Sequence, residues 1–288
     1  MSDAPPVNVI TPAQDSLSQY ANPIQIIRHL WGQRQLIWQI SQRNVLELYR
    51  GSYLGLLWSL FTPLASLLVY TFVFSVVFQA RWDQEMVGGR AEYALVLFAG
   101  LIAFNVFGES AVAAPMLIVS QAGYVKRVLF PLEILPLSNL ISAAIQSLFP
   151  LLILLLGVLF FLGQISATLY LLPLAYLPLL LLSLGVGWFL ASLGVFLRDM
   201  QHVMRIIVQL LFFLTPIFYP LSIVPPAFQR VLRLNPLTYL VEYFRQVTMF
   251  GETPHWGSYL VLTAVSLLVA WLGYLWFMKS KKTFADVV

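Results

Sequence analysis

The chain has 288 residues, of which 60% are hydrophobic and only 10% are charged, and its mean hydropathy is +0.83. A soluble domain carries about 25% charged residues, so this composition excludes a soluble globular protein and predicts several membrane-spanning helices. The net charge of +4 does not indicate nucleic-acid binding, because the basic residues are scattered in short loops, where they orient a chain in an anionic membrane. With no cysteine, disulfides and thiolate metal sites are excluded.

The first 50 residues are predicted to form a tail followed by a surface helix. Residues 1–22 hold three prolines and no long apolar run, so we expect a disordered cytoplasmic tail without a cleaved signal peptide. Asn22 and Pro23 suit the cap and first turn of a helix. Over 23–50, apolar residues recur at helical spacing with arginines between them, which predicts an amphipathic helix on the membrane interface. Gly32 is where that helix could break.

The first membrane span is expected at about 54–80. The chain carries no charge from Gly51 to Ala80, and thirty helical residues extend about 45 Å, more than the roughly 30 Å hydrocarbon core. The span is therefore expected to tilt or kink, and Pro63 near its middle removes one backbone hydrogen bond.

Five further apolar segments complete a predicted all-α polytopic membrane protein with six transmembrane helices over residues 51–280. These spans are expected at about 93–113, 134–162, 169–196, 205–219 and 256–278. Between the second and third spans, segment 115–131 interrupts the apolar pattern, with a proline at each end and Lys126 and Arg127 inside it.

Segment 220–249 is apolar but carries several prolines and charges. Its two candidate helices, Pro226–Leu234 and Pro236–Met249, are each too short to span a membrane. Irregular backbone at membrane depth must be buried in protein or line a wet cavity. We therefore predict a re-entrant helical hairpin that enters from the outer face before the last span.

The distribution of charge predicts the topology. With six spans, one side of the membrane carries 11 of the 16 Lys and Arg residues, and that side includes both termini. The positive-inside rule therefore places both termini in the cytoplasm.

The sequence offers little catalytic chemistry. It has no HExxH, no GxSxG and no GxxxxGK[ST] phosphate-binding loop, so we expect neither an enzyme nor a cofactor, and no ATP hydrolysis by a P-loop. The three histidines are far apart, which argues against a metal site. The intramembrane carboxylates to consider are Glu109 and Glu133, and both are expected near the cytoplasmic face, where each could be a solvated helix end or a coupling site.

The order of these motifs resembles that of the type-2 ATP-binding-cassette exporter permeases, and within them the O-antigen and teichoic acid branch. The resemblance covers about residues 24–280, and the segments that carry it are ELYRGSYLGLLWSLFTPLASLLVYTFVFSVVF, GYVKRVLFPLEILPLSNL, RDMQHVMRIIVQLLFFLTPIFYP and RLNPLTYLVEYFRQ. It implies a multi-pass permease of the bacterial inner membrane that forms a homodimer, binds two separate ATPase subunits and exports a lipid-linked glycan, in contact with membrane lipids and without nucleic acid.

The resemblance also suggests site residues. ATPase contacts are expected on the surface helix and on the segment before the third span, at Arg28, Arg34, Gln121, Tyr124, Lys126 and Arg127. A glycan path favours aromatic rings that stack on sugars, and the expected residues are Tyr53, Trp58, Phe61, Tyr219 and Tyr239. Arg50, where the surface helix meets the first span, could bind the substrate pyrophosphate with its planar guanidinium, or could anchor the helix end among anionic lipids.

Two other functions remain open at this stage. One is a related exporter permease for a drug, haem or lipid, which the presence or absence of neighbouring glycan-synthesis genes would distinguish. The other is a polytopic enzyme acting on lipid-linked sugars, which would need convergent carboxylates or a metal site.

Overall fold

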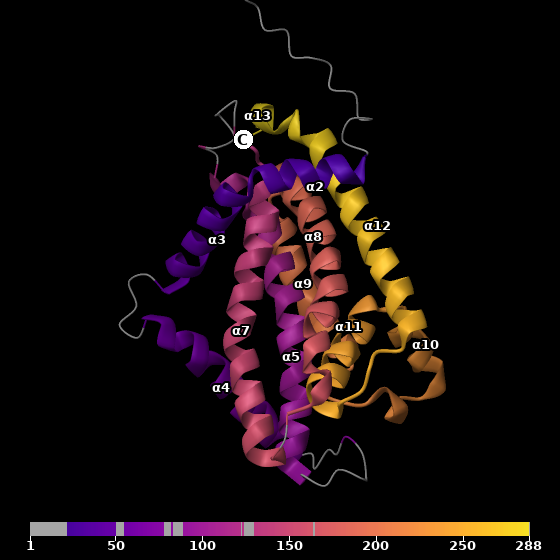
Figure 1. The fold of residues 1–288 in the computed structure, drawn as a ribbon. Helices are drawn as coiled ribbons and strands as arrows, with labels where there is room; N and C mark the ends of the chain where they lie inside the picture. Colours follow the sequence, from indigo (N-terminus) through magenta and orange to yellow (C-terminus); the bar gives the residue numbers. More distant parts are fainter. Residues whose placement is uncertain are drawn as a thin grey trace, which may run out of the picture.

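The computed structural model describes residues 22–49, 55–77, 82, 89–121, 123, 130–163 and 165–287, and within them all regular secondary structure is helical. The prediction of an all-α protein is thus confirmed for this part of the chain. The predicted disordered tail lies outside the described residues, apart from Asn22. Figure 1 shows the long helices side by side, with α2 across one end of the group.

Four of the described helices are long and apolar enough to cross a membrane. They are α5 (Gly89–Ala113), α7 (Ile134–Leu162), α8 (Leu172–Phe196) and α12 (Trp256–Lys281). Two apolar helices are shorter, namely α4 (Trp58–Tyr70), which continues into a π-helical turn at Thr71–Val77, and α9 (Met200–Leu214). The six-span count therefore remains a prediction.

The N-terminal segment divides into two helices of different direction. α2 (Pro23–Gly32) begins with the Asn22 side chain accepting a hydrogen bond from the Ile24 amide at 3.0 Å, and it ends at Gly32, the predicted break. α2 lies across the ends of the long helices. α3 (Arg34–Tyr49) starts beside α7 and is inclined to it (Figure 1). Ser142 Oγ on α7 donates to the Ser41 carbonyl at 3.1 Å. The 23–50 segment is thus not one continuous surface helix, because α3 is attached to α7.

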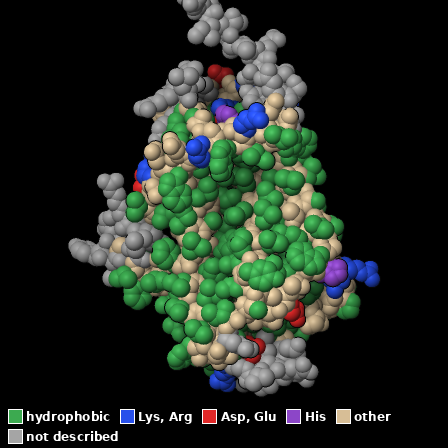
Figure 2. Space-filling model, viewed as in Figure 1, with side chains coloured by type: hydrophobic (Ala, Val, Ile, Leu, Met, Phe, Trp, Pro, Cys, Tyr) green, Lys and Arg blue, Asp and Glu red, His purple; other side chains and the backbone are tan. Residues whose placement is uncertain are grey.

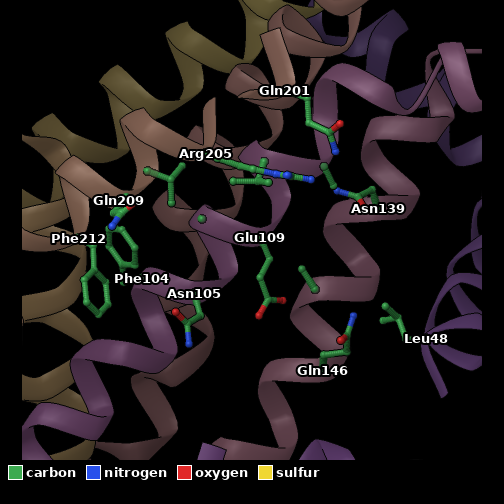
Figure 3. Close-up of a pocket in the computed structure, with 15 residues that line it drawn as sticks. Leu48, Phe104, Asn105, Glu109, Asn139, Gln146, Gln201, Arg205, Gln209 and Phe212 are labelled. Carbon is green, nitrogen blue, oxygen red and sulfur yellow. The ribbon is translucent and has the colours of Figure 1, made fainter. Parts of the chain in front are cut away.

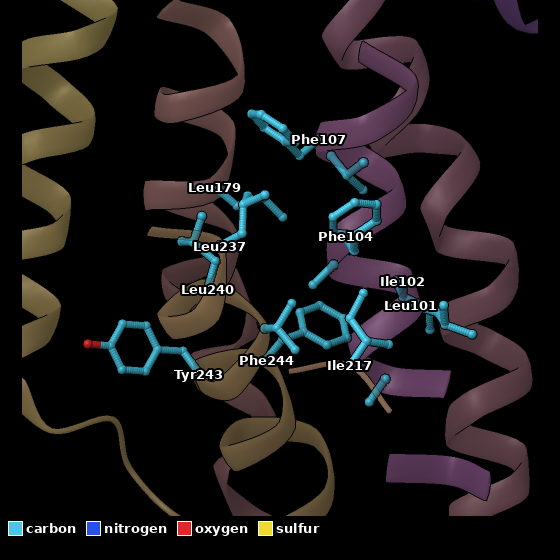
Figure 4. Packing of buried hydrophobic residues seen from close by; sticks show 14 of the residues in the cluster. Leu101, Ile102, Phe104, Phe107, Leu179, Ile217, Leu237, Leu240, Tyr243 and Phe244 are labelled. Atoms are coloured by element: carbon cyan, nitrogen blue, oxygen red, sulfur yellow. The ribbon is translucent and has the colours of Figure 1, made fainter. Parts of the chain in front are cut away.

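α5 is the central helix of the fold, since 17 of its 25 residues are buried. Its apolar side chains pack against α8 and against α11 (Pro236–Arg245), as Figure 4 shows for Phe104, Leu179 and Phe244. Next to this core, α8 and α12 approach each other closely. A Cβ atom on Gly273 would lie 2.2 Å from the carbonyl oxygen of Gly185, so this crossing requires glycine.

The chain between α9 and α12 is compact but mostly not in long helices. α9 ends at Leu214, five residues before the predicted end of the fifth span, and irregular backbone follows before α10 (Pro226–Leu234). α11 comes next and ends in a π-helical turn at Gln246–Phe250. Neither α10 nor α11 is long enough to span a bilayer, so a re-entrant position for them remains a prediction.

One arginine satisfies the carbonyl groups of this irregular backbone. Arg245, at the end of α11, is fully buried, and its Nη1 and Nη2 atoms donate to the carbonyls of Pro216 and Ile217 at 2.8 and 2.5 Å. Its Nε atom donates to the Val96 carbonyl of α5 at 3.0 Å. Arg245 therefore joins α5, the segment after α9 and α11 in a single set of hydrogen bonds.

The neighbours of Arg245 are shaped to accept it. A Cβ atom on Gly100 would lie 2.5 Å from Nη2 of Arg245, so only glycine leaves room for the guanidinium beside α5. The guanidinium also lies 4.2 Å from the ring centroid of Trp82, a cation–π distance. Glu242 is 3.8 Å away and partly exposed, so the carbonyl oxygens rather than a carboxylate are the main partners of this charge.

We expect Arg245→Met to destabilise the fold by about 3 kcal/mol or more, because three buried carbonyls lose partners worth about 1–3 kcal/mol each. Gly100→Ala should act in the same direction by displacing the guanidinium. Thermal unfolding in detergent and limited proteolysis within 215–250 would measure both effects. Gly187→Ala is the matched control, because the nearest atom to its new Cβ is 3.9 Å away. If Arg245→Met unfolds at the same temperature as the wild type, the packing of α10 and α11 does not depend on Arg245.

Candidate functional site

A cavity of about 730 Å³ lies between α5, α7 and α9, at the level of the membrane-spanning helices (Figure 3). Nearly half of the residues that line it have polar side chains. The polar side chains that line it are Asn105, Glu109, Asn139, Gln146, Gln201, Arg205 and Gln209.

Helical periodicity brings these polar residues together. On α9, Gln201, Arg205 and Gln209 are each four residues apart, and on α5 Asn105 and Glu109 have the same spacing, so each set occupies one face of its helix. Asn139 and Gln146 are seven residues apart on α7, which also places them on one face. Of these residues, only Glu109 is singled out as a functional candidate by the sequence. Polar residues inside apolar segments were the signal that could have identified Asn105, Gln146 and Gln209.

A second cavity of about 340 Å³ shares Asn105, Glu109 and Gln146 with the first and extends the polar surface along α4. We refer to the two cavities together as the polar groove. On α4 its lining includes hydroxyl groups and aromatic rings, from Trp58, Ser59, Thr62, Ser66 and Tyr70.

Two charged residues, Glu109 and Arg205, line the polar groove. Among the described residues, neither Glu109 nor Arg205 forms a hydrogen bond or an ion pair, and both side chains are exposed to the cavity. A charge at membrane depth that lacks a partner requires water or a polar ligand. The groove therefore offers two charged side chains that water or a polar ligand can bind.

The residues predicted for a glycan path fall in different places. Trp58 lines the polar groove, whereas Phe61 lies on the exposed side of α4. Tyr219 donates its hydroxyl to the Phe213 carbonyl at 3.0 Å, and Tyr239 packs against the buried core. Two others, Arg50 and Tyr53, lie outside the described residues.

The residues predicted to contact an ATPase are only partly described. Arg28 is exposed on α2, and Arg34 donates to the Trp31 carbonyl at 3.3 Å. Gln121 is half-buried in a short 3₁₀ turn. Tyr124, Lys126 and Arg127 lie outside the described residues.

A second polar cluster, which we call the Glu133 cluster, lies where α2, α7, α8 and α12 meet. Glu133 is 2% exposed, and its two carboxylate oxygens are 2.7 Å from Nε2 of His29 and 2.6 Å from Nζ of Lys281. Its backbone carbonyl accepts a hydrogen bond from Nε1 of Trp188 at 2.9 Å. Of the two roles left open for Glu133, a solvated helix end is therefore wrong, because the carboxylate is buried and paired.

The pairing in the Glu133 cluster shifts both titrating groups. The hydrogen bond to Glu133 raises the pKa of His29 above its ordinary value of 6.5. Burial acts to raise the pKa of Glu133, but the hydrogen bond with His29 and the charge of Lys281 outweigh it, so that pKa lies below 4.5. Within the described residues, no group of three His, Asp or Glu side chains is placed to hold a metal ion.

Comparison with known proteins finds one matching family and several relatives of the same name. The family model described as "ABC-2 type transporter" matches residues 35–249. An O-antigen export system permease protein RfbA from Myxococcus xanthus is 29% identical over 269 residues, covering 92% of this chain and 100% of the relative. Two proteins of the same name from Klebsiella pneumoniae are 26% and 25% identical over 252 residues, covering 86% of this chain and 93% of each relative.

The Glu133 cluster predicts a pH optimum of stability. The raised pKa of His29 contributes stability below pH 6.5 that is lost as the pH rises through the folded-state value. The lowered pKa of Glu133 contributes stability above pH 4.5 that is lost as the pH falls through its folded-state value. The cluster should therefore stabilise the fold most between these two pH values.

Melting temperatures of wild type and His29→Gln, measured from pH 4 to 9, test this expectation. The difference between the two proteins should be largest near pH 5–6 and disappear at high pH, with an amplitude of about 1 kcal/mol or less because His29 is half-exposed. His202→Gln is the control, since His202 is exposed on α9. A difference that grows with rising pH would contradict the assignment.

Proposed function

The chain belongs to the ABC-2 type transporter family, and from this membership we propose that it is the membrane-spanning subunit of an ATP-driven exporter that carries a lipid-linked polysaccharide of the O-antigen type. Three relatives that align with most of the chain are named O-antigen export permeases. The observation that carries the proposal is the polar groove, which supplies a hydrated surface along membrane-spanning helices.

The chemistry of the groove suits a sugar polymer. The side-chain amides of Asn105, Gln146 and Gln209 each donate and accept hydrogen bonds, as sugar hydroxyls do. Phe212 and Trp58 add aromatic faces on which the C–H faces of sugars can rest. Many weak contacts of this kind allow a polymer to bind without being held at one position.

The groove also distinguishes the proposal from its alternatives. A drug, haem or lipid permease would favour an apolar surface, whereas this groove carries amides, hydroxyls and two charges. An enzyme acting on lipid-linked sugars would need convergent carboxylates. In the described part of the chain, Glu109 is the one carboxylate that lines the groove.

The ATPase subunits are proposed to bind at α2 and at segment 115–131. The sequence has no P-loop of its own. The Glu133 cluster lies beside both regions, since His29 is on α2 and Glu133 is two residues after the end of the segment. Displacement of either docking region would therefore reach α7 and α12 through one buried carboxylate. Arg28, Arg34, Gln121, Tyr124, Lys126 and Arg127 stay the proposed contacts.

We assign the ATPase-binding end to the cytoplasmic side of a bacterial inner membrane. α2, the end of α12 and α13 (Phe284–Val287) lie together at this end (Figure 1). In Figure 2, basic side chains and a histidine gather there, and hydrophobic side chains cover the middle of the visible face. This arrangement agrees with two cytoplasmic termini and with a re-entrant hairpin on the outer side.

The protein is proposed to act as a homodimer. On α9, the face opposite the core presents an exposed apolar strip at helical spacing, formed by Val203, Ile206, Leu210 and Phe213. The polar groove lies on the neighbouring face of the same helix. Two copies that pair through this strip would bring their grooves together around one path.

Export should depend on the amides of the groove. Purified protein with its co-encoded ATPase, in vesicles, is expected to hydrolyse ATP faster when the lipid-linked glycan of its own host is added. Asn105→Leu/Gln146→Leu should reduce this stimulation about tenfold, because two hydrogen bonds worth about 0.5–1.5 kcal/mol each are lost. Gln42→Leu, exposed on α3 and outside both the groove and the two proposed docking regions, is the control. Stimulation by a drug or haem instead of the glycan would refute the proposed cargo.

The absence of native cysteine makes the dimer directly testable. Leu210→Cys, at a side chain that is 58% exposed on α9, should give a disulfide-linked dimer under mild oxidation in membranes. Leu260→Cys, 63% exposed on α12, is the matched control and should stay monomeric on denaturing gels. Crosslinking at 260 but not at 210 would place the contact elsewhere.

A further inference from the structure

The basic residue that lines the polar groove is Arg205. Arg205 lies six residues into α9 and lines the cavity, and in Figure 3 its side chain extends across the cavity toward Asn139 of α7. A basic residue that only anchors a helix end would turn outward to the headgroup layer. Arg205 instead points inward, and among the described residues it has no acidic partner.

The surroundings of Arg205 supply further donors. Gln201, one turn earlier on α9, and Asn139 on α7 carry side-chain amides at the same end of the cavity (Figure 3). A guanidinium presents a planar set of N–H groups that matches two phosphate oxygens, and it stays charged at physiological pH. A cluster of one guanidinium and two amides is suited to an anion that carries several oxygens.

Glu109 sets a limit to how deep such an anion can move. Figure 3 places its carboxylate beyond Arg205, on the side of the cavity where Gln146 lies. On α7, Asn139 and Gln146 are separated by about 10 Å of helix. An anion is therefore attracted at the level of Asn139 and repelled before the level of Gln146, whereas a neutral sugar meets no such barrier.

We propose that Arg205, with Asn139 and Gln201, forms a binding subsite for the diphosphate head group of a polyprenyl lipid, and that Glu109 prevents this head group from moving deeper into the groove. The subsite rests on the proposed export function and specifies which part of the substrate is recognised. For Arg50, which precedes the predicted first span, the sequence leaves open either binding of the same group or an anchoring role among lipids, so Arg205 is proposed as a separate contact inside the groove.

Direct binding to the purified permease in nanodiscs of zwitterionic lipid tests the subsite without an ATPase. The probes are a polyprenyl diphosphate and the corresponding polyprenol, with inorganic pyrophosphate as a competitor. Wild type is expected to bind the diphosphate lipid at least about tenfold more tightly than the polyprenol, since one bidentate charged contact supplies that difference. Inorganic pyrophosphate should compete, although at higher concentration because it lacks the lipid chain.

The variants have opposite expected effects. Arg205→Gln should lower the affinity for the diphosphate lipid about tenfold or more and leave polyprenol binding unchanged. Glu109→Gln should raise the affinity for the diphosphate lipid, because the repelling charge is removed. Arg198→Gln is the matched control, since Arg198 is exposed on the same side of the protein and outside the groove. If Arg205→Gln lowers the binding of both lipids, the variant has a fold defect. The test then rests on Glu109→Gln, which should still raise the affinity for the diphosphate lipid.

Two results would overturn the subsite. One is equal wild-type binding of polyprenol and polyprenyl diphosphate, and the other is unchanged diphosphate binding in both groove variants. These failures are distinct from failure of the export function, which appears when no lipid-linked glycan stimulates ATP hydrolysis by the wild-type complex.

Discussion

The fold depends on how the backbone is satisfied where it stops being helical. In a bilayer core no water is available for free N–H and C=O groups, so a non-helical segment must find partners within the protein. In the segment after α9, the carbonyls of Pro216 and Ile217 accept hydrogen bonds from Arg245. The carbonyl of Phe218 accepts one from the Tyr93 hydroxyl at 2.8 Å. Asn235 Nδ2 donates to the Thr215 hydroxyl at 3.0 Å and so attaches the start of α11 to the same segment. These bonds allow the chain to carry a short helical hairpin without exposing its backbone.

The same constraint separates the polar groups that lie among the apolar helices into two kinds. Arg245 is fully buried and its donors are satisfied by carbonyls, so it serves the structure. Glu109 and Arg205 are open to the cavity and lack protein partners in the described part of the chain, so they are available to a ligand. Where α2 crosses the ends of the long helices, Glu133 is buried but doubly paired, and it links α2 to α12. An exporter requires both kinds of group, since a rigid frame must surround a hydrated path.

Much of the architecture could be predicted because it depends on local pattern. Apolar runs predicted the long helices α5, α7, α8 and α12, and the prolines and short apolar stretches predicted that 220–249 would not form one long helix. The end of α9 was placed too late, since Pro216 to Tyr219 are apolar and hydropathy does not report where helical geometry stops. The site was harder to predict. Gln201 and Arg205 resemble an ordinary helix end in the sequence, and only their position opposite Glu109 and Asn139 makes them a site.

The sequence by itself determined the class of the protein, the all-helical fold and the segments that cannot span, because these follow from hydropathy, helical periodicity and the fixed thickness of a bilayer. Only the tertiary structure decided which charges are structural and which are free. Arg205 precedes an apolar segment and Arg245 follows an aromatic-rich one, so neither position in the sequence shows which role its charge has. Arg245 meets three carbonyls from two distant segments beside a glycine that leaves it room, whereas Arg205 faces a cavity. The role of a buried charge depends on partners that lie far away in the chain, and only packing brings those partners together.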